Sequence, residues 1–413
     1  MKNISFSVIF VLVFIAFSLS GSTAQNSNTL SIILFFVWII FAFILHPRSF
    51  FITFSKPEIK YFFLFLIFLF FTSIYVSGIL NVLKLIGLHI FIFSPIIIYN
   101  YYSQLNKSNL KIILITCLFL FLFFNFKSLI FYSEISDAAR ILAADSNALG
   151  NISIGGGYSL AYANTLISIF VFDVILNRNI KSKTIKLILF LFLLISIYVV
   201  LKTKSTLTII WLSFGLILTF FSKRAKNKVR RKSSSPLVFI ITTIILIFVF
   251  HKNIGYFLID NFRDNDVISM RLSELGRSLS SGIEASEYSE YRLSRYITSI
   301  SSFFDSILIG NGYKYGYIYK DSLPYMGGHS EWLDALANYG LIGIIPLFLF
   351  FYNSLKNNPL ITNKRISTSI IIVFILLGTF NPLISFHSML VVLLIVPTFS
   401  NFIHSSLTHT KDS

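Results

Sequence analysis

Residues 111–131 read KIILITCLFLFLFFNFKSLIF, an apolar run whose only charged residues are Lys111 and Lys127. Similar runs recur along the chain, which is 55% hydrophobic and only 12% charged over 413 residues. No soluble domain could cover that much apolar surface, so the composition predicts a membrane protein. The bilayer interior leaves backbone groups without outside partners, and near-continuous apolar runs favour helices over the alternating strands of a barrel.

The length of the runs predicts the number of membrane crossings. A crossing needs about 20 apolar residues, and this window predicts an all-α polytopic membrane protein with about 12 transmembrane helices and one large external loop. The residues Ser22-Thr23-Ala24 resemble a signal-peptide cleavage site, but we interpret the first run as a retained span. The expected spans are 4–20, 29–45, 61–78, 82–100, 111–131, 158–177, 187–203, 205–221, 236–251, 336–353, 366–380 and 383–403.

The positive charge of the chain, +17 in total, is unevenly placed. Residues 222–232 hold seven Lys or Arg and no acid, whereas residues 252–334 hold eight basic and eleven acidic residues. This asymmetry indicates a positive-inside topology rather than a nucleic-acid surface, and it predicts that both termini are cytoplasmic. The predicted organisation is helices 1–9 in residues 1–251, a large external loop in residues 252–335, and helices 10–12 with a tail in residues 336–413.

The stretch Gly327-Gly328-His329-Ser330-Glu331-Trp332-Leu333-Asp334 ends this loop. A glycine pair allows a sharp turn, and Ser330 is placed to cap the helix that re-enters the membrane. His329 would then face solvent at the membrane surface. A lone histidine is more often structural than catalytic, so its role depends on its neighbours.

Two arginines lie in the same loop. Arg292 and Arg295 are three residues apart, so on a helix they share a face and form a fork suited to a pyrophosphate or a carboxylate. The alternative is that they pair with nearby acids on a solvated surface. Lys204, where two spans meet at the external side, either extends to water or faces a cavity.

Two further polar residues lie upstream. Arg140 is in a smaller external loop, where it could be part of a surface ion pair. Asn164 lies inside a span, where an amide usually bridges helices but could also contact a ligand. Cys117 is the single cysteine and lies in an apolar run, so no cysteine-based metal site is available. No convincing Asp-x-Asp pair accompanies His329, and we expect a reaction without a metal.

Three segments, taken in order, resemble the O-antigen polymerase and O-antigen ligase superfamily of membrane glycosyltransferases. The first segment is similar to the family's Ser/Thr-Arg pair, with Lys204 in the arginine's place. The middle segment is similar to the family's Arg-x-x-x-Trp and Gly-x-Gly segment, with tyrosine as the aromatic residue. The last segment is similar to the family's His-Asn/Ser-x-x-Leu and Gly-Leu-x-Gly signatures. A looser resemblance joins Arg140 to Asn164. In chain order the three segments are Lys202-Thr203-Lys204-Ser205; Arg292, Tyr296, Gly310 and Gly312; and Gly328 to Asp334 with Gly340-Leu341-Ile342-Gly343.

The resemblance implies a GT-C-like fold in the bacterial inner membrane, with the large external loop in the periplasm. It also implies a metal-independent glycosyltransferase that uses no cofactor. The donor would be an undecaprenyl-pyrophosphate-linked oligosaccharide and the acceptor a sugar hydroxyl. His329 would be the general base, and Arg292 the main pyrophosphate contact. Arg295, Lys204, Arg140, Glu331 and Asn164 would contribute to substrate binding. A chain-length regulator protein is a further partner that the resemblance suggests, besides the membrane lipids.

The resemblance leaves the exact reaction open. A polymerase joins lipid-linked repeat units, whereas a ligase transfers finished glycan to lipid A-core. The run from Asp334 to Tyr339-Gly340 and the lysine at position 204 both favour the polymerase. A lipid-linked oligosaccharide flippase is a third alternative, but its polar residues would be expected deep in the spans, and here they gather at one external face.

Overall fold

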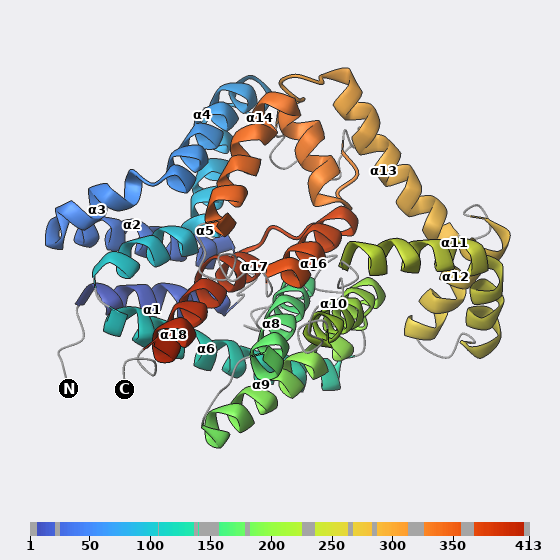
Figure 1. Ribbon diagram of the computed structural model, residues 1–413. Coiled ribbons are helices and arrows are strands. Elements are labelled where there is room, and N and C mark those ends of the chain that lie inside the picture. The colour runs from blue at the N-terminus through green and yellow to red at the C-terminus, as the bar shows by residue number, and fades with distance from the viewer. Residues whose placement is uncertain are drawn as a thin grey trace.

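The computed structural model describes residues 6–20, 25–105, 107–135, 139, 157–177, 182–224, 236–262, 267–282, 287–312, 326–356 and 367–408. Within these residues every regular element is a helix, and the described part of each segment expected to cross the membrane is mainly helical, which confirms the predicted all-α membrane fold. The elements, shown in Figure 1, are α1 (Phe6–Leu19), α2 (Gln25–Leu45), α3 (Pro47–Phe54), α4 (Pro57–Ser77), α5 (Ile79–Leu105), α6 (Lys107–Glu134), α8 (Tyr158–Asn177), α9 (Lys183–Lys202), α10 (Thr206–Arg224), α11 (Pro236–Asn261), α12 (Val267–Ser281), α13 (Glu287–Asp305), α14 (Glu331–Lys356), α16 (Ser367–Phe380), α17 (Phe386–Leu390), the π-helix η2 (Val391–Ile395) and α18 (Val396–Thr408).

Among the described residues, six helices are long and apolar enough to cross a membrane on their own: α4, α5, α6, α8, α9 and α14. The pair α2 and α3 is bent by 120° and makes a seventh crossing if it counts as one span. Shorter apolar helices occur in α1, in α10, in α16 and in the run that starts with α17. The chain is therefore a multi-pass membrane protein, and the number of twelve crossings stays a prediction.

Helix α3 lies between the expected spans 29–45 and 61–78, where the sequence analysis predicts no helix. Pro47 is in the first turn of α3, and Pro57 is in the first turn of α4. Because proline lacks a backbone N–H and fits the first turn of a helix, each of them ends one helix and begins the next. The connection between α2 and α4 is therefore a short helix that carries Arg48 between two bends.

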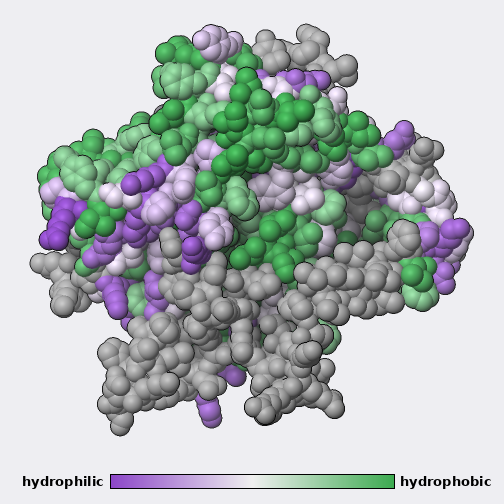
Figure 2. Space-filling view, turned by 45° about the horizontal axis from the view of Figure 1, so that its top comes forward, coloured by the Kyte–Doolittle hydropathy of each residue, from purple (hydrophilic) through white to green (hydrophobic). Residues whose placement is uncertain are grey.

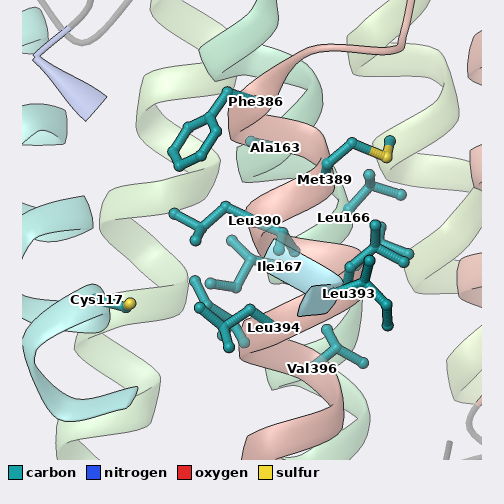
Figure 3. Close-up of a cluster of buried hydrophobic side chains, with 14 of the residues drawn as sticks. Cys117, Ala163, Leu166, Ile167, Phe386, Met389, Leu390, Leu393, Leu394 and Val396 are labelled. Carbon is teal, nitrogen blue, oxygen red and sulfur yellow. The ribbon is translucent and has the colours of Figure 1, made fainter. Parts of the chain in front are cut away.

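The centre of the bundle is α8. Every residue from Leu160 to Val171 is buried, although the segment contains polar side chains as well as apolar ones. Figure 3 shows the α17–η2–α18 segment packed along α8, with Met389 and Leu393 on one side and Cys117 of α6 nearby. This packing encloses α8 on several sides, so the other helices are arranged around it.

The outer surface is apolar where lipid would cover it. On α4, Leu64, Ile67 and Phe71 are exposed at helical spacing, and the remaining faces of α4 pack on α5 and α14. Figure 2 shows hydrophobic side chains spread over much of one face of the molecule. An exposed apolar surface of this extent is what a bilayer requires.

The polar insertion at 252–335 is helical rather than a plain loop. Helix α11 continues to Asn261, so the expected boundary at 251 falls inside a helix. It forms a hairpin with α12, where Gly255 and Gly276 let the backbones meet: a Cβ atom on either glycine would lie 2.7 Å from the other's carbonyl oxygen. In Figure 1, α13 runs from this hairpin across to α14. The insertion thus supplies a long helix beside the motif that contains His329.

Candidate active site

A tight turn from Gly327 to Ser330 carries His329 to the start of α14. The backbone N–H of Leu333 donates to Ser330 Oγ at 3.3 Å, which confirms the predicted helix cap. Gly328 has a φ of +72°, a left-handed conformation that residues with side chains rarely adopt. The glycine therefore lets the chain turn directly before the histidine.

The hydroxyl of Ser299 on α13 holds this turn in place. Ser299 Oγ accepts a hydrogen bond from the backbone N–H of Gly327 at 2.8 Å and donates to Asp334 Oδ1 at 2.5 Å. The same carboxylate oxygen accepts from the N–H of Gly328 at 3.3 Å. Ser299 and Asp334 are both buried, so water competes little for these bonds. The two side chains therefore clamp the backbone on which His329 sits.

Both arginines of α13 lie beside this turn. A Cβ on Gly327 would overlap the carbonyl oxygen of Arg295, so the turn rests directly on the α13 backbone. The Arg295 guanidinium lies 4.9 Å from the centre of the Tyr291 ring, and the His329 ring meets the same tyrosine edge to face at 5.7 Å. Arg292, on the same face of α13, is half-buried. The structure therefore brings together three residues that the sequence analysis proposed independently.

The electrostatics of the site act on the histidine. Burial, and after it the positive charges of Arg292 and Arg295, together lower the pKa of His329 to about 4. The imidazole is consequently neutral at physiological pH. A neutral imidazole has a free nitrogen lone pair, which is the form that a general base requires.

The turn between α16 and α17 forms the third wall of the site. Arg292 Nη1 donates to the carbonyl oxygen of Phe380 at 3.2 Å, and the N–H of Glu331 donates to the carbonyl oxygen of Asn381 at 3.3 Å. Glu331 Oε2 in turn accepts from the N–H of Ile384 at 2.9 Å. The Glu331 carboxylate is therefore used to fasten α14 to this turn.

The motif glycines form a second junction between the loop and α14. Gly340 interrupts α14 with φ +57° and ψ −170°, and a Cβ there would lie 2.5 Å from the backbone nitrogen of Gly310. The N–H of Asn311 donates to the carbonyl oxygen of Ala337 at 2.9 Å beside this contact. Gly312 packs in a similar way on α4, where its Cβ would lie 2.8 Å from the Thr72 carbonyl oxygen. These glycines join the segment after α13 to α14 and α4.

Lys204 lies between α9 and α10 and has a φ of +53°. Its backbone N–H donates to the carbonyl oxygen of Leu201, in the last turn of α9, at 3.2 Å. The start of α10 nevertheless approaches the site, because the Trp211 ring stacks on the Phe380 ring at 5.7 Å, and the Phe380 carbonyl oxygen is the acceptor for Arg292. A role for Lys204 in substrate binding stays a prediction.

Asn164, another expected binding residue, is not part of this cluster. Asn164 on α8 exchanges two hydrogen bonds of 2.9 Å with Asn125 on α6, so the structure uses it as a bridge between helices. Arg140 lies outside the described residues. Among the residues that are described, no group of three His, Cys, Asp or Glu side chains is placed to hold a metal ion.

The structure also adds residues that the sequence analysis missed. Ser299 could have been found, because it lies seven positions after Arg292 and therefore on the same face of a helix. Tyr291 carried no signal of its own. The turn at Asn381 lies between the expected spans 366–380 and 383–403. It contributes to the site through the carbonyl oxygens of Phe380 and Asn381, which are backbone atoms that any sequence would provide.

The arrangement defines a multi-pass membrane protein with a neutral histidine and two cationic side chains gathered at the end of its bundle. In a comparison with protein families, residues 188–348 match the family described as O-antigen ligase. The match runs from α9 into α14 and includes all three motif segments, so it confirms the resemblance to the O-antigen polymerase and ligase superfamily over this part of the chain. It is common to polymerases and ligases, and it gives no support to a flippase. No curated protein matches the chain.

Proposed function

We propose that the protein is an O-antigen or surface-polysaccharide polymerase that joins undecaprenyl-pyrophosphate-linked repeat units at the periplasmic face of the inner membrane. The observation that carries the proposal is the cluster of His329 with Arg292 and Arg295, held on α13 and on the turn before α14, within the region that matches the family. A general base beside paired guanidiniums suits the transfer of a glycan from a pyrophosphate leaving group.

In this reaction the acceptor sugar hydroxyl attacks the anomeric carbon of the donor. The new bond joins the acceptor oxygen to that carbon, and the bond from the carbon to the phosphate oxygen breaks. His329 takes the hydroxyl proton, and undecaprenyl pyrophosphate leaves with the bonding electrons. Arg292 and Arg295 stabilise its negative charge, which needs cations more than it needs a proton.

The low pKa of His329 fits this order of events. In the empty site, burial and the arginines lower the pKa to about 4, which would make the imidazole a weak base. A bound pyrophosphate carries negative charge to the same arginines and offsets their effect, so the pKa rises when the donor is present. The base therefore becomes effective once the leaving group is in position.

Two buried donors beside this cluster are suited to glycan oxygens. Trp211 Nε1 and Asn381 Nδ2 have no hydrogen-bond partner within the described part of the chain. Trp211 stacks on Phe380, which directly precedes Asn381 in sequence. Buried donors are normally satisfied, and sugar hydroxyls would satisfy them here.

The contacts of α5 support the expected topology. At one end, Tyr102 Oη donates to Ser7 at 3.0 Å, and Asn401 donates to Tyr99 Oη at 2.9 Å, so α1 and α18 meet the same end of α5. His89, about 15 Å away along α5, approaches the Tyr339 hydroxyl on α14 at 3.4 Å. Ser7 near the start of α1 and Asn401 in α18 thus contact the end of α5 that lies away from Tyr339, in keeping with cytoplasmic termini and a periplasmic site.

The experiment is to complement a strain that lacks the gene with wild type, His329→Ala or the control His46→Ala, at equal membrane abundance. His46 is exposed and precedes α3, away from the cluster. Wild type and the control should restore long polysaccharide chains, and His329→Ala should leave lipid A-core that carries a single repeat unit.

Two outcomes would contradict the proposal. If the deletion leaves bare core while long lipid-linked polymer accumulates, the protein is a ligase. If His329→Ala restores the same ladder as wild type, the histidine is not the base. The assay should be repeated in vitro with purified lipid-linked repeat units, because a product formed without a second compartment excludes simple transport.

A further inference from the structure

The helix that carries the arginines has a second face with no described protein cover. Around α13, successive residues are about 100° apart, and Arg292, Arg295, Ser299 and Ser302 fall on the face that meets the candidate site. A face on roughly the opposite side of the helix is apolar and exposed. The exposed fractions of its side chains are 40% for Leu293, 54% for Ile297, 39% for Ile300 and 65% for Phe304. We call these four residues the α13 stripe.

The remaining face of α13 is polar. Glu290, Ser294, Ser301 and Asp305 are all exposed and lie next to the α13 stripe around the helix. A helix with one apolar stripe and one polar stripe, both uncovered, has the pattern of a helix that lies at a membrane surface with its apolar side in the lipid.

The apolar surface does not end with α13. Leu308 and Ile309 follow in the chain and are 61% and 53% exposed. The N–H of Ile342 on α14 donates to the Leu308 carbonyl oxygen at 2.9 Å, and from there the exposed residues Ile345 and Phe348 continue along the membrane-spanning part of α14. The α13 stripe is therefore followed by exposed apolar residues that lead to α14, a helix long and apolar enough to cross the membrane.

We propose that α13 lies in the outer surface of the bilayer, with the α13 stripe in contact with phospholipid acyl chains. The lipid then sets the depth of α13, and Arg292 and Arg295 lie on the side of the helix that is turned away from the acyl chains, from which long guanidinium side chains can reach the level of the lipid phosphates. The placement of α13 stands on its own, and its consequence rests on the proposed function. A polyprenyl pyrophosphate has its chain in the acyl region and its phosphates at this level, so it would meet the arginines without leaving the membrane.

The test measures the surroundings of single cysteines in the full chain, in nanodiscs. The native Cys117 is fully buried, so a fluorophore will label the introduced residue. Ile297→Cys and Leu293→Cys report on the α13 stripe, and Ser294→Cys is the matched control on the polar face of the same helix. Each labelled protein is exposed to a phospholipid with a nitroxide near the headgroup and, separately, to iodide in water.

We expect the nitroxide lipid to quench the two stripe positions roughly threefold more strongly than position 294, and iodide to show the reverse order. Equal quenching of all three positions by the lipid would overturn the proposal, as would strong iodide quenching at 293 and 297. If neither reagent reaches the stripe, a second copy of the chain or another protein covers it, and the proposal fails. Since the readout does not need glycan transfer, it can succeed or fail independently of the polymerase assay.

Discussion

The serine on α13 offers the sharpest test of how the site is built. In Ser299→Ala, the N–H of Gly327 loses its acceptor and Asp334 loses its shortest hydrogen bond, of 2.5 Å. Neither group touches the substrate in the proposed reaction. The change therefore acts only through the backbone turn that carries His329, and it makes Ser299 a positioning residue.

The size of the effect follows from the two bonds. A hydrogen bond to a charged acceptor contributes about 1.5–3 kcal/mol and a neutral one about 1 kcal/mol. Relaxation and water recover part of that sum, because Gly327 is only half-buried. We expect the free energy that holds the turn in its active conformation to fall by about 2 kcal/mol, which corresponds to a roughly 30-fold lower kcat. KM should change little, because the arginines that bind the pyrophosphate stay in place.

The assay is the initial rate of chain extension from purified lipid-linked repeat units. Ser294→Ala is the control, since it is the same substitution on the exposed face of α13. In addition, Ser299→Ala combined with Asp334→Ala should cost little more than the stronger single variant, because both remove one clamp. The reasoning is refuted if Ser299→Ala keeps its kcat within about twofold of wild type, or if Ser294→Ala loses as much.

Two further predictions concern the charge and the glycines of the site. Because burial and the two guanidiniums lower the pKa of His329 to about 4, the imidazole of the free enzyme stays neutral down to that pH. Arg295→Gln removes one positive charge and raises this pKa, so the acid limb of the pH profile of kcat/KM should move to higher pH. An acid limb that does not move would contradict the assignment of His329 as the base. Gly340→Ala places a Cβ on a left-handed backbone and against Gly310, so the free energy of unfolding should fall by about 3 kcal/mol and the apparent Tm should fall with it. Gly87→Ala is the control: its Cβ would meet one methyl group at 3.9 Å, and its Tm should not change.

Much of the fold could be predicted because its signals are local. Apolar runs of sufficient length locate the helices, and the spacing of Arg292 and Arg295 on one face follows from the period of a helix. The cap at Ser330 is likewise a short-range feature. These inferences need no knowledge of which helices touch, and the structure agrees with each of them.

What could not be predicted depends on contacts between distant segments. The sequence shows two glycine motifs, at Gly310 and Gly340, but not that their backbones would meet. It shows Asn164 in a span but not Asn125 as its partner, and the amide could as well have faced a ligand. The choice between these outcomes is made by tertiary packing, for which a single sequence carries no direct signal.

The turn between α16 and α17 shows why the matched region alone does not make the site. The family match ends at residue 348, yet the carbonyl oxygens of Phe380 and Asn381 accept hydrogen bonds from Arg292 and Glu331. These acceptors belong to the backbone, so they place no demand on the side chains at 380 and 381. A chain can therefore vary in this turn and still hold the arginine and the start of α14 in register. In the proposed reaction, the side chains of α13 and of the turn before α14 would carry out the transfer, and the backbone of the turn between α16 and α17 would hold them in place.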